Sequence, residues 1–401
     1  MKRFSDAEYK YVKEVLDGEF RASNMSKMIA RFESAFAEKF GTAYAISHNS
    51  GTSTLHSAVA AVGASDGGEV IVPPLTMAST TLSVLYESAI PVFVDVDPNT
   101  FNLDPSKVEQ AISPRTKAIM PVSVYGLSPD FDPIMQIAAK HNLKVIEDDA
   151  ETYLGKYKGR LVGSIGHLSS FSLQGSKHIT SGEGGVVLTN DEALADKVRQ
   201  FAIVGYDIVR AKSGELTRSK VQSPDFIRHT SLGFKYKMSD ICAAVALGQL
   251  ERLDELVKMR QLCGKTFKAA VEGCDWIKPQ LAGPDFEHSY YTFAARLDLS
   301  QVDFSWHDFR SKFIELGGDG FYAAWRLTYH EPMWKSQDFR IRNVVQHPRY
   351  SANFVETCRS SCPNAELIQP QIMQFKTNYY ESSEVEQQAE VLQRTIKFFE
   401  G

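Results

Sequence analysis

From about residue 42 to 190, short apolar runs rich in β-branched residues alternate with longer stretches in which apolar residues recur at helical spacing. This order is typical of a mostly parallel sheet that is covered by helices on both faces. The pattern predicts about seven strands in one α/β domain, with helices such as 52–62 and 132–141 between them. We expect the strands at residues 42–47, 69–73, 91–95, 118–122, 144–147, 169–173 and 185–189.

Helical spacing of apolar residues also extends on both sides of this region. The first 35 or so residues are expected to be helical and to pack back on one of the domains. After Met238 the apolar positions follow a helix again, from Ile241 to Leu253. We therefore expect a large domain over residues 1–245 and a smaller α+β domain over residues 246–401.

Two segments show neither a strand-like pattern nor a helical spacing of apolar residues clearly. Residues 205–229 are polar and carry charges of both signs, which is typical of a loop and sometimes of a lid. Residues 317–330 (GGDGFYAAWRLTYH) form an aromatic strip with one arginine, Arg326. A strip of this kind either lines a substrate site or packs a core, and the sequence favours neither.

Composition narrows the class of protein. A chain of 401 residues with 43% hydrophobic residues can bury a large core. Its net charge of -5, without a long basic run, argues against nucleic acid or an anionic membrane as a partner. It has neither a signal-peptide pattern nor an apolar run of about 20 residues, so we expect a cytoplasmic protein. The five cysteines lack metal-ligand spacing, and we expect reduced thiols and no metal site.

Two charged residues follow apolar strands closely. Asp148 comes directly after one run, and Lys177 lies in a glycine-rich segment five residues after Ser172. Ligands of open α/β sheets bind beyond the carboxyl ends of the strands, so both side chains could reach the same edge. A lysine amine can hold pyridoxal phosphate as a Schiff base, while a carboxylate keeps the pyridine nitrogen protonated. Alone, Asp148 could cap a turn and Lys177 could be a solvated lysine; together they favour the cofactor.

A possible phosphate site lies at the end of the first predicted strand. Ser50, Gly51 and Thr52 begin the next helix, where free backbone N–H groups and the helix dipole favour an anion. A serine here is also a common N-cap without any ligand. Ser172 is ambiguous in the same way.

Seven segments of the chain look like those of the DegT/StrS family of sugar aminotransferases. They occur in the family's order over roughly residues 30–260, and the last part of the chain resembles the family less clearly. The segments are NSGT at 49–52, VPPLT at 72–76, PVFVDVD at 91–97, VIEDDA at 145–150, FSLQGSK at 171–177, TSGEGG at 180–185 and GFKYKM at 233–238.

The resemblance implies a fold-type I transferase that depends on pyridoxal 5'-phosphate (PLP) and forms a homodimer with active sites at the subunit interface. By position, Lys177 would be the Schiff-base lysine and the carrier of the substrate proton. Asp148 would bind the pyridine nitrogen, and Ser172 with the segment 50–52 would bind the phosphate. A relative with histidine at the lysine position performs dehydration, so Lys177 favours amino transfer.

Three positions depart from the family pattern. Glu151 stands where many members have glutamine or histidine, which would put another carboxylate near the cofactor ring. It could be protonated, paired with a base, or simply a solvated substitution. Met77 replaces an aromatic residue expected to cover the ring, and a thioether can still do so. Lys235 replaces an asparagine that the partner subunit usually offers to the phosphate.

These features predict a PLP-dependent aminotransferase of carbohydrate biosynthesis. The amino donor would be glutamate or glutamine, and the acceptor a ketone of a nucleotide-linked keto-deoxy sugar, a keto-polyol or a small sugar phosphate. Two alternatives remain at this point: a PLP-dependent dehydratase or lyase on the same scaffold, and a non-catalytic binding protein. The second should lack the lysine or the acid, and both are present.

Overall fold

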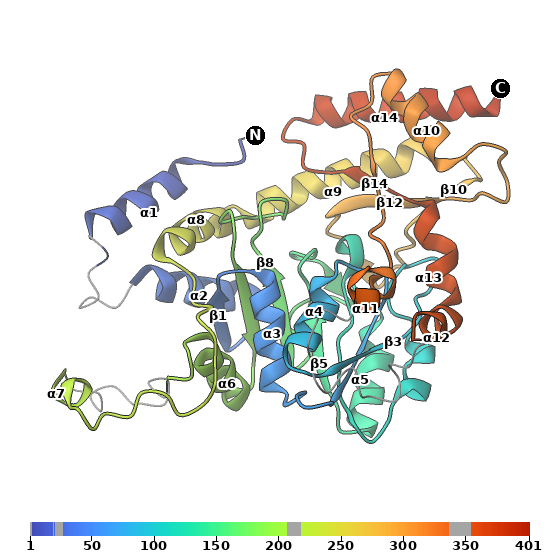
Figure 1. Ribbon diagram of the computed structural model, residues 1–401. Helices are drawn as coiled ribbons and strands as arrows, with labels where there is room; N and C mark the ends of the chain where they lie inside the picture. Colours follow the sequence, from blue (N-terminus) through green and yellow to red (C-terminus); the bar gives the residue numbers. More distant parts are fainter. Residues whose placement is uncertain (1, 19, 21–26, 207–217, 337–353) are drawn as a thin grey trace.

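A seven-stranded sheet organises the first half of the chain (Figure 1). The structure is a computed structural model that describes residues 2–18, 20, 27–206, 218–336 and 354–401. The strand order is β1-β9-β8-β5-β4-β2-β3, and only β9 runs antiparallel to its neighbours. This confirms the predicted α/β class and the mostly parallel sheet. The strands are β1 (Tyr44–His48), β2 (Glu69–Val72), β3 (Ile90–Phe93), β4 (Thr116–Ile119), β5 (Lys144–Asp148), β8 (Leu168–Ser172) and β9 (Gly185–Thr189).

Both faces of this sheet are buried, which explains the continuous apolar runs. In β9, Val187 packs into one core cluster, whereas Val186 and Leu188 pack into another, because successive side chains point to opposite faces. The first cluster also contains residues of α3, α4, α5 and α6, and the second contains residues of α2 and α8. These helices are α2 (Lys27–Phe40), α3 (Gly51–Ala61), α4 (Ser79–Tyr86), α5 (Phe131–Lys140), α6 (Glu192–Ala202) and α8 (Asp240–Glu251).

The predicted helical N-terminus is confirmed in its described part. Helix α1 (Asp6–Asp17) begins with a capping box between Ser5 and Glu8, and it packs against α8. Residues 19 and 21–26, and residues 207–217 of the expected loop, lie outside the described residues. Around the latter gap, Tyr206 pairs with His229, and the short helix α7 covers Arg218–Gln222.

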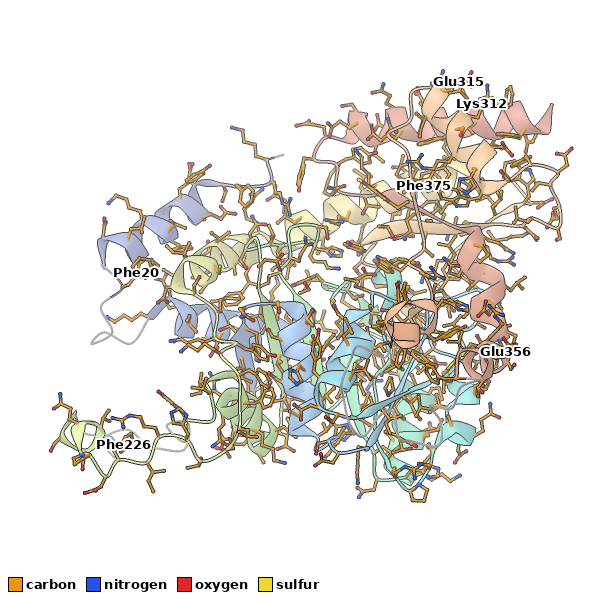
Figure 2. All side chains as sticks on the ribbon, viewed as in Figure 1. Phe20, Phe226, Lys312, Glu315, Glu356 and Phe375 are labelled. Atoms are coloured by element: carbon orange, nitrogen blue, oxygen red, sulfur yellow. The ribbon has the colours of Figure 1, made fainter. Side chains whose placement is uncertain are left out.

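A second, four-stranded antiparallel sheet lies in the C-terminal part, in the order β10-β12-β14-β13. Its core is aromatic: Phe375 of β14 lies 5.3 Å from Phe267 of α9 and 5.6 Å from Phe313 of α10, between ring centroids (Figure 2). The elements are α9 (Leu253–Ala270), β10 (Ile277–Pro279), β12 (Thr292–Leu297), α10 (Trp306–Glu315), β13 (Tyr322–Ala323), β14 (Ile372–Lys376) and α14 (Ser382–Glu400).

The remaining elements connect the two sheets. A small sheet joins β6 (Lys156–Tyr157) and β7 (Arg160–Leu161) to the distant β11 (Phe286–Glu287). Helices α11 (Met333–Ser336), α12 (Phe354–Ser361) and α13 (Pro363–Ile368) bring buried side chains to the core of the large sheet. Short 3₁₀ turns cover Pro105–Lys107, Glu109–Ala111, Val124–Gly126, Thr328–His330 and Gln369–Gln371.

The expected division at residue 245 falls within α8, and part of the later chain packs on the large sheet. The exact domain limits therefore stay a prediction. Among the helices in the described part of the chain, none has both the length and the apolar character that crossing a membrane requires.

Candidate active site

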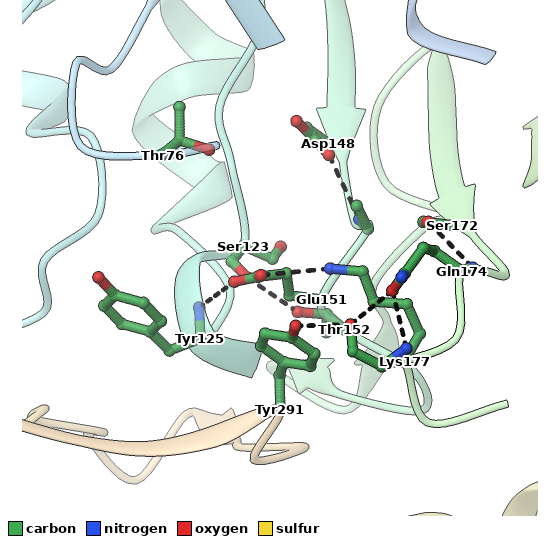
Figure 3. Close-up of polar contacts among 12 residues, drawn as sticks. Thr76, Ser123, Tyr125, Asp148, Glu151, Thr152, Ser172, Gln174, Lys177 and Tyr291 are labelled. Carbon is green, nitrogen blue, oxygen red and sulfur yellow. Dashed lines mark hydrogen bonds and ion pairs between the residues drawn. The ribbon is translucent and has the colours of Figure 1, made fainter. Parts of the chain in front are cut away.

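Asp148 and Lys177 both lie at the carboxyl edge of the large sheet (Figure 3). Asp148 is the last residue of β5, and Lys177 lies in the loop that follows the neighbouring strand β8. Glu151 comes from the loop after β5, and Tyr291 approaches from the C-terminal part just before β12. Four side chains from three segments thus surround one space at the end of parallel strands, where ligands of such sheets bind.

Asp148 is a buried and oriented carboxylate, 4% exposed. Its Oδ2 accepts a hydrogen bond from Thr80 Oγ1 at 2.7 Å, and its Oδ1 accepts one from the backbone N–H of Ala150 at 3.3 Å. Burial raises the pKa of Asp148, while these donors and the nearby Lys177 ammonium act in the opposite direction. A carboxylate with few donors in a dry site is a good partner for a positively charged N–H group.

The amine of Lys177 lies between a carboxylate and an aromatic ring. Its Nζ is 3.3 Å from Glu151 Oε1 and 4.2 Å from the centroid of Tyr291. Burial is the largest single effect and disfavours the ammonium, but Glu151, Tyr291 and Asp148 together outweigh it, so the pKa of Lys177 lies above its ordinary value. The Tyr291 ring adds a cation–π contact on the other side. The carboxylate of Glu151 and the ring of Tyr291 therefore hold the Lys177 amine in its protonated form.

Glu151 is not a solvated substitution, because it is only 5% exposed. Its Oε1 faces Lys177, and its Oε2 accepts the backbone N–H of Tyr125 at 2.9 Å. Tyr125 has a φ of 60°, a left-handed conformation that costs about 1 kcal/mol or more and is maintained by surrounding packing. Burial raises the pKa of Glu151, and Lys177 only partly offsets this. The pairing with a base, one of the three possibilities at this position, is the one that the structure shows.

Replacing Glu151 by glutamine is expected to lower the pKa of Lys177. The main group that favours the ammonium is removed, while the burial that disfavours it remains. The pH dependence of labelling of Lys177 by an amine-directed reagent, followed by peptide mass spectrometry, should shift to lower pH. As a control, Glu33→Gln removes a carboxylate that contacts Arg199 and should leave the profile unchanged. An unchanged profile for Glu151→Gln would contradict the pairing.

The predicted phosphate segment lies beside Ser172. Ser50 is the N-cap of α3, and its Oγ accepts the backbone N–H of Ser53 at 3.1 Å, so its hydroxyl is already engaged. A Cβ at Gly51 would lie 2.8 Å from Ser172 Cβ, so only glycine allows this close approach. No acceptor is found among the described residues for the backbone N–H of Gly51 or Thr52. These two N–H groups are the ones left for an anion. The hydroxyls of Thr52 and Ser172 already bond Ser79 Oγ at 2.9 Å and the backbone N–H of Gln174 at 3.3 Å, respectively.

Two predicted residues lie apart from this cluster in the single chain. Met77 is 53% exposed, and Lys235 is exposed in a segment that pairs with Ile203. Neither is joined to Lys177 or Asp148 by a contact within the described residues. Their expected roles therefore depend on a second subunit or a bound cofactor.

A cavity of about 470 Å³ opens next to Lys177. For the aromatic strip 317–330, both expected roles are observed, each for different residues. Tyr322 and Trp325 line the cavity, while Phe321 and Tyr329 are buried in the core. The lining consists of Ser176, Arg260, Tyr291, Thr292, Tyr322, Ala323, Ala324, Trp325, Gln374, Lys376, Thr377 and Asn378. The sequence interpretation missed Arg260, Tyr291 and Tyr125, because no motif or period singles them out.

These groups suit a phosphorylated pyridine aldehyde. Asp148 provides a buried acceptor for a pyridine N–H, Lys177 provides the amine, and the start of α3 provides unpaired N–H groups beside Ser172. A buried lysine and acid at the edge of a mostly parallel sheet are the arrangement expected of a PLP-dependent enzyme.

The chain matches the DegT/DnrJ/EryC1/StrS aminotransferase family over residues 3–373. This protein belongs to that family, and the resemblance inferred from the seven segments is confirmed. It is therefore an aminotransferase that uses PLP as its cofactor, an amino donor and a keto acceptor.

Named relatives support the same class. The chain is 44% identical over 259 residues to GDP-perosamine synthase of Caulobacter vibrioides. This match covers 65% of this chain and 66% of that protein. It is 35% identical over 311 residues to L-glutamine:2-deoxy-scyllo-inosose aminotransferase of Micromonospora echinospora, covering 76% and 72%. The solved aminotransferase from Psychrobacter cryohalolentis superposes with a TM-score of 0.84 at 27% identity, covering 99% and 98%.

Proposed function

We propose that this protein transfers an amino group from glutamate or glutamine to the ketone of a nucleotide-linked keto-deoxy sugar in the synthesis of glycan precursors. The observation that carries the proposal is the buried Lys177 amine, which lies within electrostatic reach of Asp148 and contacts Tyr291, a residue that lines the cavity. Relatives named GDP-perosamine synthase at 44% and 37% identity support a nucleotide-linked acceptor. Tyr322, 70% exposed at the cavity, offers a stacking surface for a base or a sugar ring.

In this proposal each residue of the site has a defined task, and Lys177 has two. Asp148 accepts the pyridine N–H, Lys177 holds the cofactor through its amine, and Gly51, Thr52 and Ser172 bind the phosphate. When bound, PLP supplies the electron sink that allows a proton to leave the substrate carbon. Lys177, once its amine is free, takes that proton and returns it as general base and acid. Glu151 stabilises the ammonium form of Lys177 during this exchange.

We further propose a homodimer in which Lys235 acts at the partner's site. Apolar side chains around Lys235 are exposed in the single chain: Leu232 is 93% exposed and Phe234 is 45% exposed. Exposed apolar groups gathered in this way are typical of an interface. A second copy that covers this segment would bury them and bring Lys235 towards a phosphate, where its charge would favour binding.

Incubation of the PLP-loaded protein with one donor and one acceptor tests the proposed reaction. L-Glutamate or L-glutamine is combined with a GDP-linked keto-deoxy sugar or with 2-deoxy-scyllo-inosose, and products are quantified by mass spectrometry. The expected result is an aminated GDP sugar formed in equal amount to the keto acid from the donor.

Amination of the cyclitol alone would contradict the nucleotide-linked acceptor and favour a keto-polyol. Loss of water from the sugar without an equal amount of keto acid would contradict amino transfer and identify a dehydratase. Absence of product from every pair of donor and acceptor, with cofactor bound, would contradict both the proposed donor and the proposed acceptor.

A further inference from the structure

Arg260 of α9 is a buried cation without a carboxylate partner among the described residues. It is 6% exposed, and its guanidinium donates only to neutral oxygens. Burial lowers the pKa of Arg260 to about 10, so the group still carries its charge at neutral pH. A buried charge is costly unless its donors are satisfied, so a specific reason is needed for its place in the fold.

The hydrogen bonds of Arg260 join the lysine loop to the C-terminal part. Nη2 donates to the carbonyl oxygens of Ser176 at 2.8 Å and Lys177 at 3.0 Å. Nη1 donates to the carbonyl oxygen of Tyr291 at 2.8 Å and to Thr377 Oγ1 at 3.4 Å. The planar guanidinium of Arg260 thus binds the main chain of the lysine loop on one side, and Tyr291 and Thr377 of the C-terminal part on the other.

Tyr291 and a second arginine also contact the lysine loop. Two cations contact the Tyr291 ring, with Lys177 Nζ at 4.2 Å and Arg260 Cζ at 5.7 Å from its centroid. The Tyr291 hydroxyl also lies 2.9 Å from Ser176 Oγ. A second guanidinium, that of Arg3, donates to the carbonyl oxygen of Gly175, so three consecutive carbonyls of the lysine loop are bound by arginine.

We propose that Arg260 is a positioning residue for Lys177. By binding the carbonyls of Ser176 and Lys177, it directs the Lys177 amine towards Glu151 and over Tyr291. This inference rests on the proposed catalytic role of Lys177 but concerns the placement of the amine, which can be measured without catalysis. Lysine at position 260 cannot replace the planar fork that spans four oxygens.

The test compares Arg260→Gln and Arg260→Lys with the matched variant Arg199→Gln. Arg199 is likewise a partly buried arginine that donates hydrogen bonds within the fold, to the carboxylate of Glu33 and the carbonyl of Ala45, and neither of these partners belongs to the lysine loop. Without Arg260 the amine should leave its partner Glu151, so its pKa should fall and its labelling by an amine-directed reagent near neutral pH should rise about ten-fold in the cofactor-free chain. In the loaded enzyme kcat should fall about 100-fold, with little change in KM for the donor.

Both Arg260 variants should show these changes, and Arg199→Gln should show neither. If the Arg260 variants fold poorly, Arg260→Ala with added guanidinium ion provides the second measurement. Arg260 lines the cavity, so the free ion can reach the vacated position. Recovery of kcat and of slow Lys177 labelling, at an unchanged melting temperature, is the expected result.

Unchanged labelling of Lys177 in folded Arg260→Gln, or kcat that guanidinium does not restore, would overturn the proposal. If the wild-type protein transfers no amine but its Lys177 labelling still depends on Arg260, the proposed function fails and the positioning role stands.

Discussion

Lys177→Ala is expected to lower amino transfer about 10⁴-fold while the protein keeps its fold. The variant loses both the amine that holds the cofactor and the group that moves the substrate proton. It also leaves Glu151 buried without its cation, which destabilises the protein, although Glu151 can respond by taking up a proton. Activity is measured as keto acid formed from the donor, and stability by thermal unfolding.

Two further variants separate chemistry from folding. Lys177→Ala combined with Glu151→Gln removes the unpaired charge, so it should unfold at a higher temperature than the single variant and remain inactive. Lys158→Ala, which breaks an exposed ion pair with Asp132, should retain activity. Substantial transfer by folded Lys177→Ala would contradict the assignment of the catalytic lysine.

The same variant tests the shared active site. If Lys235 acts at the partner's site, Lys235→Ala is impaired alone, but dimers mixed with Lys177→Ala contain one complete site. Statistical mixing should then recover roughly a quarter of the wild-type activity. No recovery from mixed dimers would place Lys235 outside the partner's site.

Asp148→Asn is expected to lower kcat about 100-fold or more and to weaken cofactor binding. Asparagine keeps the size of the side chain and can still accept the hydrogen bond from Thr80, but it carries no charge to hold a pyridine proton. Cofactor affinity is measured by equilibrium dialysis, and kcat by donor turnover.

The conservative variant Asp148→Glu serves as the comparison. It keeps the charge at a shifted position, so it should retain more activity than Asp148→Asn if charge is what matters. Equal loss in both variants, with intact folding, would show that geometry at this position matters more than charge. Full activity of Asp148→Asn would contradict the proposed role.

Much of this fold and part of its site could be predicted locally. The strands were recognisable because a parallel sheet buries both faces, which produces apolar runs such as 70–72 and 186–188. Asp148 and Lys177 were recognisable because each follows such a run, and strand ends converge at one edge of the sheet. Gly51 was recognisable as the start of a helix, and the structure adds that Ser172 leaves no space for a Cβ there.

Other parts of the site could not be predicted from local pattern. For Glu151 the sequence left three possibilities open, because whether a carboxylate is solvated or paired depends on what covers it. The covering groups are Tyr125 and Lys177, which are 26 residues away in each direction along the chain. The aromatic strip was divided between core and cavity by the pairing of β13 with β14.

The sequence by itself determined the class of fold and the cofactor chemistry, and it predicted Asp148 and Lys177 as the two residues most central to that chemistry. These predictions depend on residue type and on position along one strand and its loop. Only the tertiary structure decided the charge partner of Lys177, the wall of the cavity and the place of Arg260. Arg260 contacts backbone carbonyls of Lys177 and Tyr291, which are 83 and 31 residues away. Carbonyl oxygens are the same in every residue, so contacts of this kind leave no mark on the sequence around them.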